Sequence, residues 1–303
     1  MVVYVQRILR AGRINMIENY LLEELVTFAE CGTLSKTADK LMITQPTITR
    51  GLQKLESEFG VPLFNRQPNR LTLTKAGQLA AEGAKKLLDD NQKLVDRVKN
   101  YAESQRVIRI GGTAPGPLIV ANQLDLPHLD VASETGNFIL VNDVTSLLEN
   151  HEDTLILSHE EMQTDDVESI YIGKERLDVN IDQFTLLANR QSVKFSDLKD
   201  MSFIVLSDIG PWRQIIQDQI PGAKFLYQGE MAALQEITRY SNFPYFSTNV
   251  TELSNHKRRD DDDRTRVVIS DEAAQMEFYA VYLKKDRRLV TPVVKELTKL
   301  WPK

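Results

Sequence analysis

The residues best suited to a specific chemistry lie in one short segment, 44–50, which reads Thr-Gln-Pro-Thr-Ile-Thr-Arg. Pro46 suits the first turn of a helix, because the N–H group that proline lacks would have no helical partner there. The other polar side chains of this turn can form hydrogen bonds. In the major groove of DNA, glutamine can pair bidentately with adenine and arginine with guanine. The segment therefore predicts a helix whose Gln45, Thr47 and Arg50 contact base edges.

Further polar and basic side chains near this helix could hold DNA phosphates, which supply most of the affinity of a protein for DNA. We expect such contacts from Ser35, Lys36, Thr44 and Thr49. Ser35 and Thr44 could instead be plain helix caps, and the two roles are compatible. Lys54 belongs to the same candidate set, although a solvated lysine on the outer face of the helix is the simpler interpretation.

Three helices must position these residues. The first is predicted over 18–31, where apolar residues recur at spacings of three and four, and Gly32 ends it. A short helix over 35–42 and a longer one over 45–59 follow. Two helices joined by a tight turn, the second opening on polar residues, form the helix-turn-helix pattern.

A two-stranded wing is predicted after the third helix. Leucine alternates with threonine over residues 71–74, which is the period of a half-buried strand, and Pro68-Asn69 is a turn signal. Arg66 and Arg70 would lie near the tip of this wing, where they could reach the DNA backbone or the minor groove.

Charge is segregated within this region. The whole chain carries a formal charge of −6, so DNA binding must depend on a local patch rather than on overall charge. Residues 44–75 carry five cations and two acids, whereas residues 18–41 carry two cations and five acids. Positive charge therefore lies on the predicted third helix and wing. The excess per chain is small, so we expect binding by a dimer or a larger assembly.

A long helix is predicted over residues 75–105, capped by Thr74. Apolar residues recur along it at alternating spacings of three and four, namely Ala80, Ala84, Leu87, Leu94, Val98 and Tyr101, with Asn91 in the same series. This spacing is typical of a helix that pairs with another helix, so we expect a homodimer or homotetramer. A long helix packed only on its own domain is the alternative.

Residues 106–303 alternate predicted strands and helices, which favours an α/β sheet with helices on both faces. Strands are expected at 107–110, 154–158, 169–172, 184–187, 203–206, 224–227, 267–269 and 277–283. Helices are expected at 143–150, 212–219, 231–240 and 291–300, with at most a short helix around 118–124 in a proline-rich stretch.

Ligands of open α/β sheets tend to bind beyond the carboxyl ends of the strands. Hydroxyl groups near predicted strand ends make Thr113, Ser158, Ser207 and Thr248 the candidate effector-binding residues. Each of them could instead be an ordinary cap or loop hydroxyl. Trp212 could line the same cleft, but anchoring a helix is its simpler role.

No sequence motif indicates a catalytic residue, a cofactor or a metal. The four histidines lack metal-ligand spacing, and neither a glycine-rich phosphate loop nor a nucleophile elbow occurs. Four aspartates at 260–263 are expected in a solvated loop rather than in a metal site. Cys31 is the only cysteine, which is typical of a cytoplasmic protein, and no apolar run approaches the ~18 residues of a membrane helix.

Residues 20–75 resemble the winged helix-turn-helix of the LysR-type bacterial transcription regulators. The resemblance rests on Leu25, Phe28, Gly32, Leu34, Ala38, Leu41, Thr44-Gln45-Pro46, Ile48, Thr49, Leu52, Leu55-Glu56, Gly60, Leu63-Phe64, Arg66, Leu71-Thr72 and Thr74-Lys75-Ala76-Gly77. Two features depart from the family: Thr37-Ala38 replaces two alanines, and prolines interrupt the helix after the first effector strand. The resemblance implies a dimerising linker helix, a tetramer more than a dimer, and two α/β subdomains, similar to periplasmic binding proteins, that hold a small molecule between them.

The sequence thus predicts four segments: an extension over 1–15 that need not be native, a winged helix-turn-helix over 16–74, a linker helix over 75–105 and an effector-binding domain over 106–303. The expected function is transcription regulation, with double-stranded DNA and an unidentified small-molecule effector as partners. An enzyme fused to a DNA-binding domain is one alternative, and it would need a catalytic or cofactor motif in the last segment. A solute-binding module that only dimerises through its N-terminal part is the other, and the segregated cations argue against it.

Overall fold

The computed structural model describes residues 16–68, 70–104, 106–254 and 262–302. These residues form two compact units that divide within one long helix, between Asp96 and Arg97. The predicted extension over 1–15 and most of the charged segment 257–264 lie outside the described residues.

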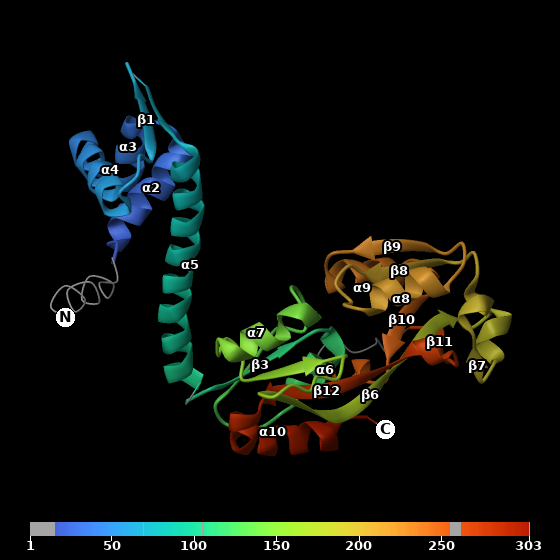
Figure 1. Ribbon diagram of the computed structural model, residues 1–303. Helices are drawn as coiled ribbons and strands as arrows, with labels where there is room; N and C mark the ends of the chain where they lie inside the picture. The colour runs from blue at the N-terminus through green and yellow to red at the C-terminus, as the bar shows by residue number, and fades with distance from the viewer. Residues whose placement is uncertain (1–15, 69, 105, 255–261, 303) are drawn as a thin grey trace. The chain divides into compact units, whose positions relative to one another are not determined.

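The N-terminal unit packs three helices around one apolar core (Figure 1). The helices are α2 (Asn19–Cys31), α3 (Leu34–Leu41) and α4 (Gln45–Phe59), and they confirm the predicted helix-turn-helix. Side chains at spacings of three and four fill the core, among them Leu21, Leu25, Phe28, Ile48, Leu52 and Leu55. Gly32 and Gly60 end α2 and α4 in the left-handed conformation, at φ values of 72° and 67°, which glycine adopts without a steric penalty.

The predicted wing is confirmed. Strands β1 (Phe64–Gln67) and β2 (Arg70–Leu73) pair antiparallel, and Gln67 and Arg70 form the pair nearest the turn. The Thr74 hydroxyl accepts a hydrogen bond from the Gly77 N–H at 3.0 Å, so Thr74 caps the following helix as expected.

Helix α5 (Lys75–Ser104) is one continuous helix of 30 residues. Its first turns pack on the core of the N-terminal unit, because Ala81 and Ala84 are buried there. Ala84 therefore does not face outward, as a position in a free seam would. Farther along, Leu87 and Leu94 are each 50% exposed, and Val98 and Tyr101 are exposed to a similar extent. The Tyr101 ring lies against His151, with the ring centroids 5.1 Å apart.

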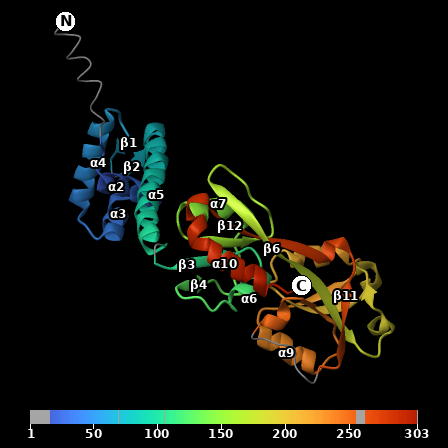
Figure 2. The same ribbon diagram turned by 90° about the horizontal axis from the view of Figure 1, so that it is seen from below.

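The described part of the C-terminal unit is built on a sheet of eight strands (Figures 1 and 2). Seven of them run across the sheet in the order β4 (Leu129–Val131), β3 (Ile108–Gly112), β5 (Leu155–Ser158), β12 (Gln275–Leu283), β6 (Val167–Asp182), β11 (Arg264–Ile269) and β7 (Ser192–Val193). The eighth, β10 (Tyr245–Thr248), pairs with β6. A separate parallel pair consists of β8 (Ser202–Leu206) and β9 (Lys224–Gln228).

Strand β6 runs through two lobes. Residues 167–176 of this strand pair with β12, and from Leu177 onward it pairs with β10 and β11. Lobe 1 contains β3, β4, β5 and β12 with the helices α6 (Pro115–Ala121), α7 (Val144–Glu149) and α10 (Arg287–Leu300). Lobe 2 contains β7 to β11 with the helices α8 (Trp212–Gln219) and α9 (Met231–Arg239). The chain thus has the predicted α/β class and two-subdomain architecture.

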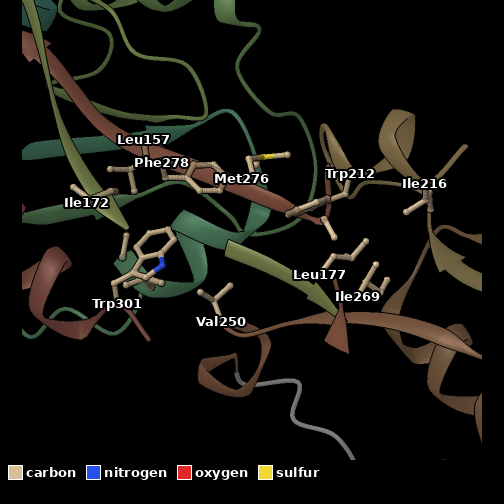
Figure 3. Close-up of a cluster of buried hydrophobic side chains, with 14 of the residues drawn as sticks. Leu157, Ile172, Leu177, Trp212, Ile216, Val250, Ile269, Met276, Phe278 and Trp301 are labelled. Carbon is tan, nitrogen blue, oxygen red and sulfur yellow. The ribbon is translucent and has the colours of Figure 1, made fainter. Parts of the chain in front are cut away.

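Alternating side chains of the sheet face different layers. Leu155 and Leu157 belong to the large core with α6 and α10, whereas Ile156 between them packs with Val144 and Leu148 of α7. The large core continues into lobe 2, so that one cluster of buried side chains extends from Trp301 to Trp212 (Figure 3).

Several element predictions were wrong in their details. Residues 184–187 form no strand; they lead into a 3₁₀ helix at Leu186–Asn189, and the Phe184 side chain is 88% exposed. The short helix expected around 118–124 begins at Pro115, because proline is well tolerated in a first turn. The last helix begins at Arg287 rather than near 291 and contains Pro292. Strands β4, β7 and β10 were not predicted.

Candidate nucleic-acid interface and effector cavity

The start of α4 presents its polar side chains outward. Gln45, Thr47 and Arg50 are exposed, while Ile48 between them is fully buried and anchors the helix in the core. The Thr44 hydroxyl bonds to the Thr47 hydroxyl at 2.8 Å and caps no backbone N–H. Of the two roles predicted for Thr44, side-chain capping is therefore absent, and its hydroxyl stays at the exposed helix start.

The hydroxyl groups of this surface differ in how they are engaged. Thr49 donates a hydrogen bond to the Gln45 carbonyl oxygen at 3.0 Å. Thr33, and not Ser35, caps α3 by accepting a hydrogen bond from the Lys36 N–H at 3.4 Å. Ser35 is exposed and makes no hydrogen bond with the described residues, so its side chain is available to a ligand.

Two of the predicted DNA-contacting cations are held by carboxylates. Lys54 lies 2.7 Å from Glu18, a residue of the segment before α2. Arg66 lies 2.6 Å from Glu56 of α4. Both pairs are solvent-exposed on the cation side, and exposed pairs of this kind contribute little stability. The fold therefore positions these two cations, and both remain accessible to a phosphate.

Glu56 ties the wing to α4. Its Oε1 accepts hydrogen bonds from the N–H groups of Leu63 and Phe64 at 2.9 and 3.1 Å. Partial burial acts to raise the pKa of the Glu56 carboxyl, but the hydrogen bonds from Arg66, Phe64 and Leu63 outweigh it and hold the pKa below its ordinary value.

Within residues 16–75, four exposed cations have no ion pair with the described residues: Lys36, Arg50, Arg70 and Lys75. They come from α3, α4, the wing and the start of α5, the same elements that carry the polar candidates. The positive charge that segregates in the sequence thus remains available on these elements, as a DNA-binding surface requires.

A buried acid lies behind this surface. Glu24 of α2 is 3% exposed, and its Oε2 has no hydrogen-bond partner among the described residues. It packs against Gly51 of α4, where a Cβ atom would come within 1.7 Å of this oxygen. Burial, with a smaller contribution from Glu23, raises the pKa of Glu24 from 4.5 to about 7.

Replacing this acid should make the protein more stable at alkaline pH. The pKa of Glu24 is raised in the folded state, so the unfolded chain ionises first as pH rises, and stability falls between pH 4.5 and about 7. Between pH 5 and pH 8 the free energy of unfolding should fall by about 2–3 kcal/mol because of this acid. We expect Glu24→Gln to abolish this fall, as measured by urea unfolding at both pH values. Glu58→Gln on the exposed face of α4 is the control, and an equal effect of both variants would refute this assignment.

The four effector candidates lie in two different places. Thr113 and Ser158 are buried in lobe 1, where the Thr113 hydroxyl bonds to His159 Nδ1 at 2.7 Å and Ser158 accepts a hydrogen bond from the Glu160 N–H. Ser207 follows β8 and Thr248 ends β10, both in lobe 2. The structure therefore does not bring the four hydroxyl groups together.

A cavity of about 520 Å³ opens between the two lobes. Thr248 lines it, whereas Thr113, Ser158 and Ser207 do not. Trp212, labelled in the buried cluster of Figure 3, is 2% exposed and anchors α8 in the core. The same residue also lines the cavity. The volume is in the range that holds one small metabolite.

Glu175 lines the cavity and is missing from the predicted set. It lies on β6 at the point where the strand passes from lobe 1 to lobe 2. Its Oε2 accepts a hydrogen bond from Trp212 Nε1 at 3.1 Å, and the Thr248 hydroxyl donates another. Burial raises the pKa of Glu175 to about 7, because these two neutral donors only partly offset the loss of water. One acid in a strand of ordinary composition carries no signal that would have identified it.

The described residues contain neither a metal-binding cluster nor a membrane-spanning helix. No group of three or more histidine, cysteine, aspartate or glutamate side chains there is arranged to hold a metal ion. Among the same residues, no helix has the length and apolar character needed to span a membrane.

The fold defines a winged helix-turn-helix unit followed by a two-lobed α/β unit, and comparisons with known proteins agree. Residues 20–78 match the bacterial regulatory helix-turn-helix proteins of the lysR family. The SDS degradation transcriptional activation protein of Pseudomonas sp. (strain ATCC 19151) is 33% identical over 107 residues, which are 34% of each chain. The HTH-type regulator YybE of Bacillus subtilis, described as uncharacterized, is 23% identical over 90% of this chain and 94% of its own length.

A solved structure shows the same fold along almost the whole chain. Vibrio fischeri DarR, determined in complex with DNA, matches with a TM-score of 0.56 and 17% identity over 93% of this chain and 99% of that chain. The N-terminal unit therefore belongs to the lysR family of bacterial regulatory helix-turn-helix proteins, and an HTH-type regulator matches 90% of the chain. The match to the Pseudomonas relative spans only about a third of that protein, so its activity is not transferred to this chain.

Proposed function

We propose that this protein is a sequence-specific DNA-binding transcription regulator of the cytoplasm whose C-terminal unit senses a small molecule. The observation that carries the proposal is the exposed polar start of α4, with Gln45, Thr47 and Arg50 outward and Ile48 buried beneath them. An enzyme would need a nucleophile, metal or cofactor site in residues 106–303, and the described residues give no support for one. The proposal is therefore that the protein acts by binding DNA and a small molecule.

In the proposed complex, α4 enters the major groove. Gln45, Thr47 and Arg50 meet base edges, and Pro46 keeps the first turn regular at the groove. Phosphates on either side are held by the remaining candidates, namely Ser35, Lys36, Thr44, Thr49, Lys54, Arg66 and Arg70. Lys54 and Arg66 are both exposed in their ion pairs, and they reach these phosphates by exchanging their carboxylate partners for phosphate.

The proposed assembly pairs two chains through α5, either as a dimer or as a pair of dimers in a tetramer. The half-exposed Leu87 and Leu94 lie one heptad apart, so both face the same side of the helix. A two-fold dimer places two copies of α4 on inverted half-sites separated by about one or more turns of DNA. Residues 16–74 then bind DNA, 75–105 link the chains, and 106–303 bind the effector.

A gel shift with the DNA upstream of the protein's own gene tests the proposal. A retarded band that resists nonspecific competitor DNA is the expected result. If the protein binds no DNA at low salt, the N-terminal unit serves dimer contacts only, and a solute-binding module is the better description.

Arg50→Ala should reduce operator affinity by about 1–3 kcal/mol and relax the sequence preference at one base pair. Arg70→Ala provides the contrast, because removing a phosphate-binding cation from the wing should weaken binding to all sequences by a similar factor. Titrations of a half-site library with both variants would measure this. Equal affinity and unchanged preference for Arg50→Ala would show that α4 does not read the bases.

A further inference from the structure

The cavity between the lobes has an acidic lining. Its described lining residues include seven carboxyl side chains and three guanidinium groups. Two of the guanidinium groups are paired with carboxylates: Arg264 lies 2.9 Å from Asp262, and Arg266 lies 2.7 Å from Glu252. The third, of Arg239, lies over the ring of the adjacent tyrosine, 5.5 Å from its centroid. The described lining thus has four more carboxyl groups than guanidinium groups, and an anion entering the cavity would meet mainly carboxylates.

Glu175 is the most deeply placed of these carboxyl groups. Its side chain is 2% exposed, and its partners Trp212 and Thr248 are both uncharged. The carboxyl group also packs against the first turn of α6, since a Cβ atom on Gly116 would come within 2.3 Å of Glu175 Oε2.

The remaining walls of the cavity are largely apolar. Ile119 of α6, Leu177 of β6, Ile204 of β8, Leu234 of α9 and Phe246 of β10 all line it. A ligand that fills this space needs an apolar body as well as a polar end, because apolar contact area supplies most of the affinity in such sites.

We propose that the effector is a small organic cation, an amine or guanidinium compound with an apolar body, whose charged nitrogen pairs with Glu175 between the lobes. The inference rests on the proposed role of the C-terminal unit as an effector sensor. A buried carboxylate with only neutral partners is unsatisfied electrostatically, and a cationic nitrogen provides charge-assisted hydrogen bonds to it. A neutral polyol would leave that charge uncompensated, and a carboxylate ligand would add a second charge of the same sign.

Two matched sets of compounds test the ligand class on the full-length protein. One set is putrescine, 1,4-butanediol and succinate, and the other is phenethylamine, 2-phenylethanol and phenylacetate. Within each set the body is similar and the end group is cationic, neutral or anionic. At ~10 mM, a concentration at which even a millimolar complex is largely formed, we expect at least one amine to raise the melting temperature and the other members to have no effect.

Glu175→Gln keeps the shape of the side chain and removes its charge, so amine affinity measured by calorimetry should fall about tenfold or more. Asp208→Asn, at an exposed position of the lining, should lower the affinity by a smaller factor, and it provides a second test if the first variant folds poorly. Glu236→Gln, on an exposed position of α9 outside the lining, should leave amine binding unchanged.

The inference is overturned if no amine of either set binds, if the alcohols or carboxylates stabilise the protein as well as the amines, or if amine affinity survives both lining variants. A gel shift on the same samples separates this outcome from failure of the proposed function. A protein that binds promoter DNA but ignores the amines is a regulator with another effector. A protein that binds no DNA at low salt refutes the proposed function, whatever the amines do.

Discussion

The double variant Leu87→Glu, Leu94→Glu should be monomeric and should lose operator affinity by at least about 100-fold, because two linked half-sites gain this much by binding together. Both side chains are 50% exposed in the single chain, so the substitutions leave its own core intact. In a paired helix the same positions would be buried, and four glutamates would then face one another across the dimer. Sedimentation velocity gives the mass of the particle, and a gel shift gives the affinity.

Gln78→Glu with Gln92→Glu is the matched control for this variant. It adds the same charge to α5, and both glutamines lie on exposed positions outside the apolar series, although Gln92→Glu also removes an exposed hydrogen bond to Asp96. The control should remain dimeric and should lose affinity only through its added negative charge. If the Leu87→Glu, Leu94→Glu protein sediments as a dimer, the chains pair through another surface, and α5 packs only on its own domain.

Local patterns predicted the elements of the N-terminal unit well, because neighbouring residues determine them. Pro46 and the polar residues around it mark the start of α4, and Thr74 both ends the wing and caps α5. These signals depend on backbone hydrogen bonds within a few residues of each other. The same argument explains why the helix-turn-helix and wing were predicted almost residue by residue.

Contacts between distant residues could not be predicted in this way. Lys54 was expected in solvent, and its partner Glu18 lies 36 residues earlier in the chain. Residues 184–187 have a strand-like composition, but a strand also needs a neighbour with open backbone groups, and none pairs there among the described residues. Glu175 is buried only because β6 crosses between two lobes at that position. The four hydroxyl groups predicted to bind the effector do not lie together. Strand ends lie together only if their strands are neighbours, and these hydroxyl groups lie at or just after the ends of strands in two different lobes.

Gly77→Ala should destabilise the N-terminal unit by about 3 kcal/mol or more, although alanine is the better helix former. A Cβ atom at this position would lie 2.1 Å from the carbonyl oxygen of Leu63. That carbonyl cannot move aside easily, because it accepts the Thr74 N–H at 2.9 Å, and the Thr74 hydroxyl donates to the Pro62 carbonyl at 3.0 Å. The backbone of the wing and the first turn of α5 therefore meet at a distance that only glycine allows.

Gly83→Ala, six residues later in the same helix, makes this prediction specific. Apart from the two chain neighbours and the helix's own backbone, no atom of the described structure lies within 4 Å of a Cβ atom at Gly83, so alanine there should stabilise the helix by about 0.5–1 kcal/mol. Hydrogen exchange of peptides from α2 and α4 in urea measures both effects within the N-terminal unit. Opposite signs for the two substitutions would show that the close approach to Leu63, and not helix propensity, controls the junction between the wing and α5. If Gly77→Ala were as stable as the unchanged protein, the wing would not be held against α5 as described, and the direction in which α5 leaves the DNA-binding unit would have to be set elsewhere.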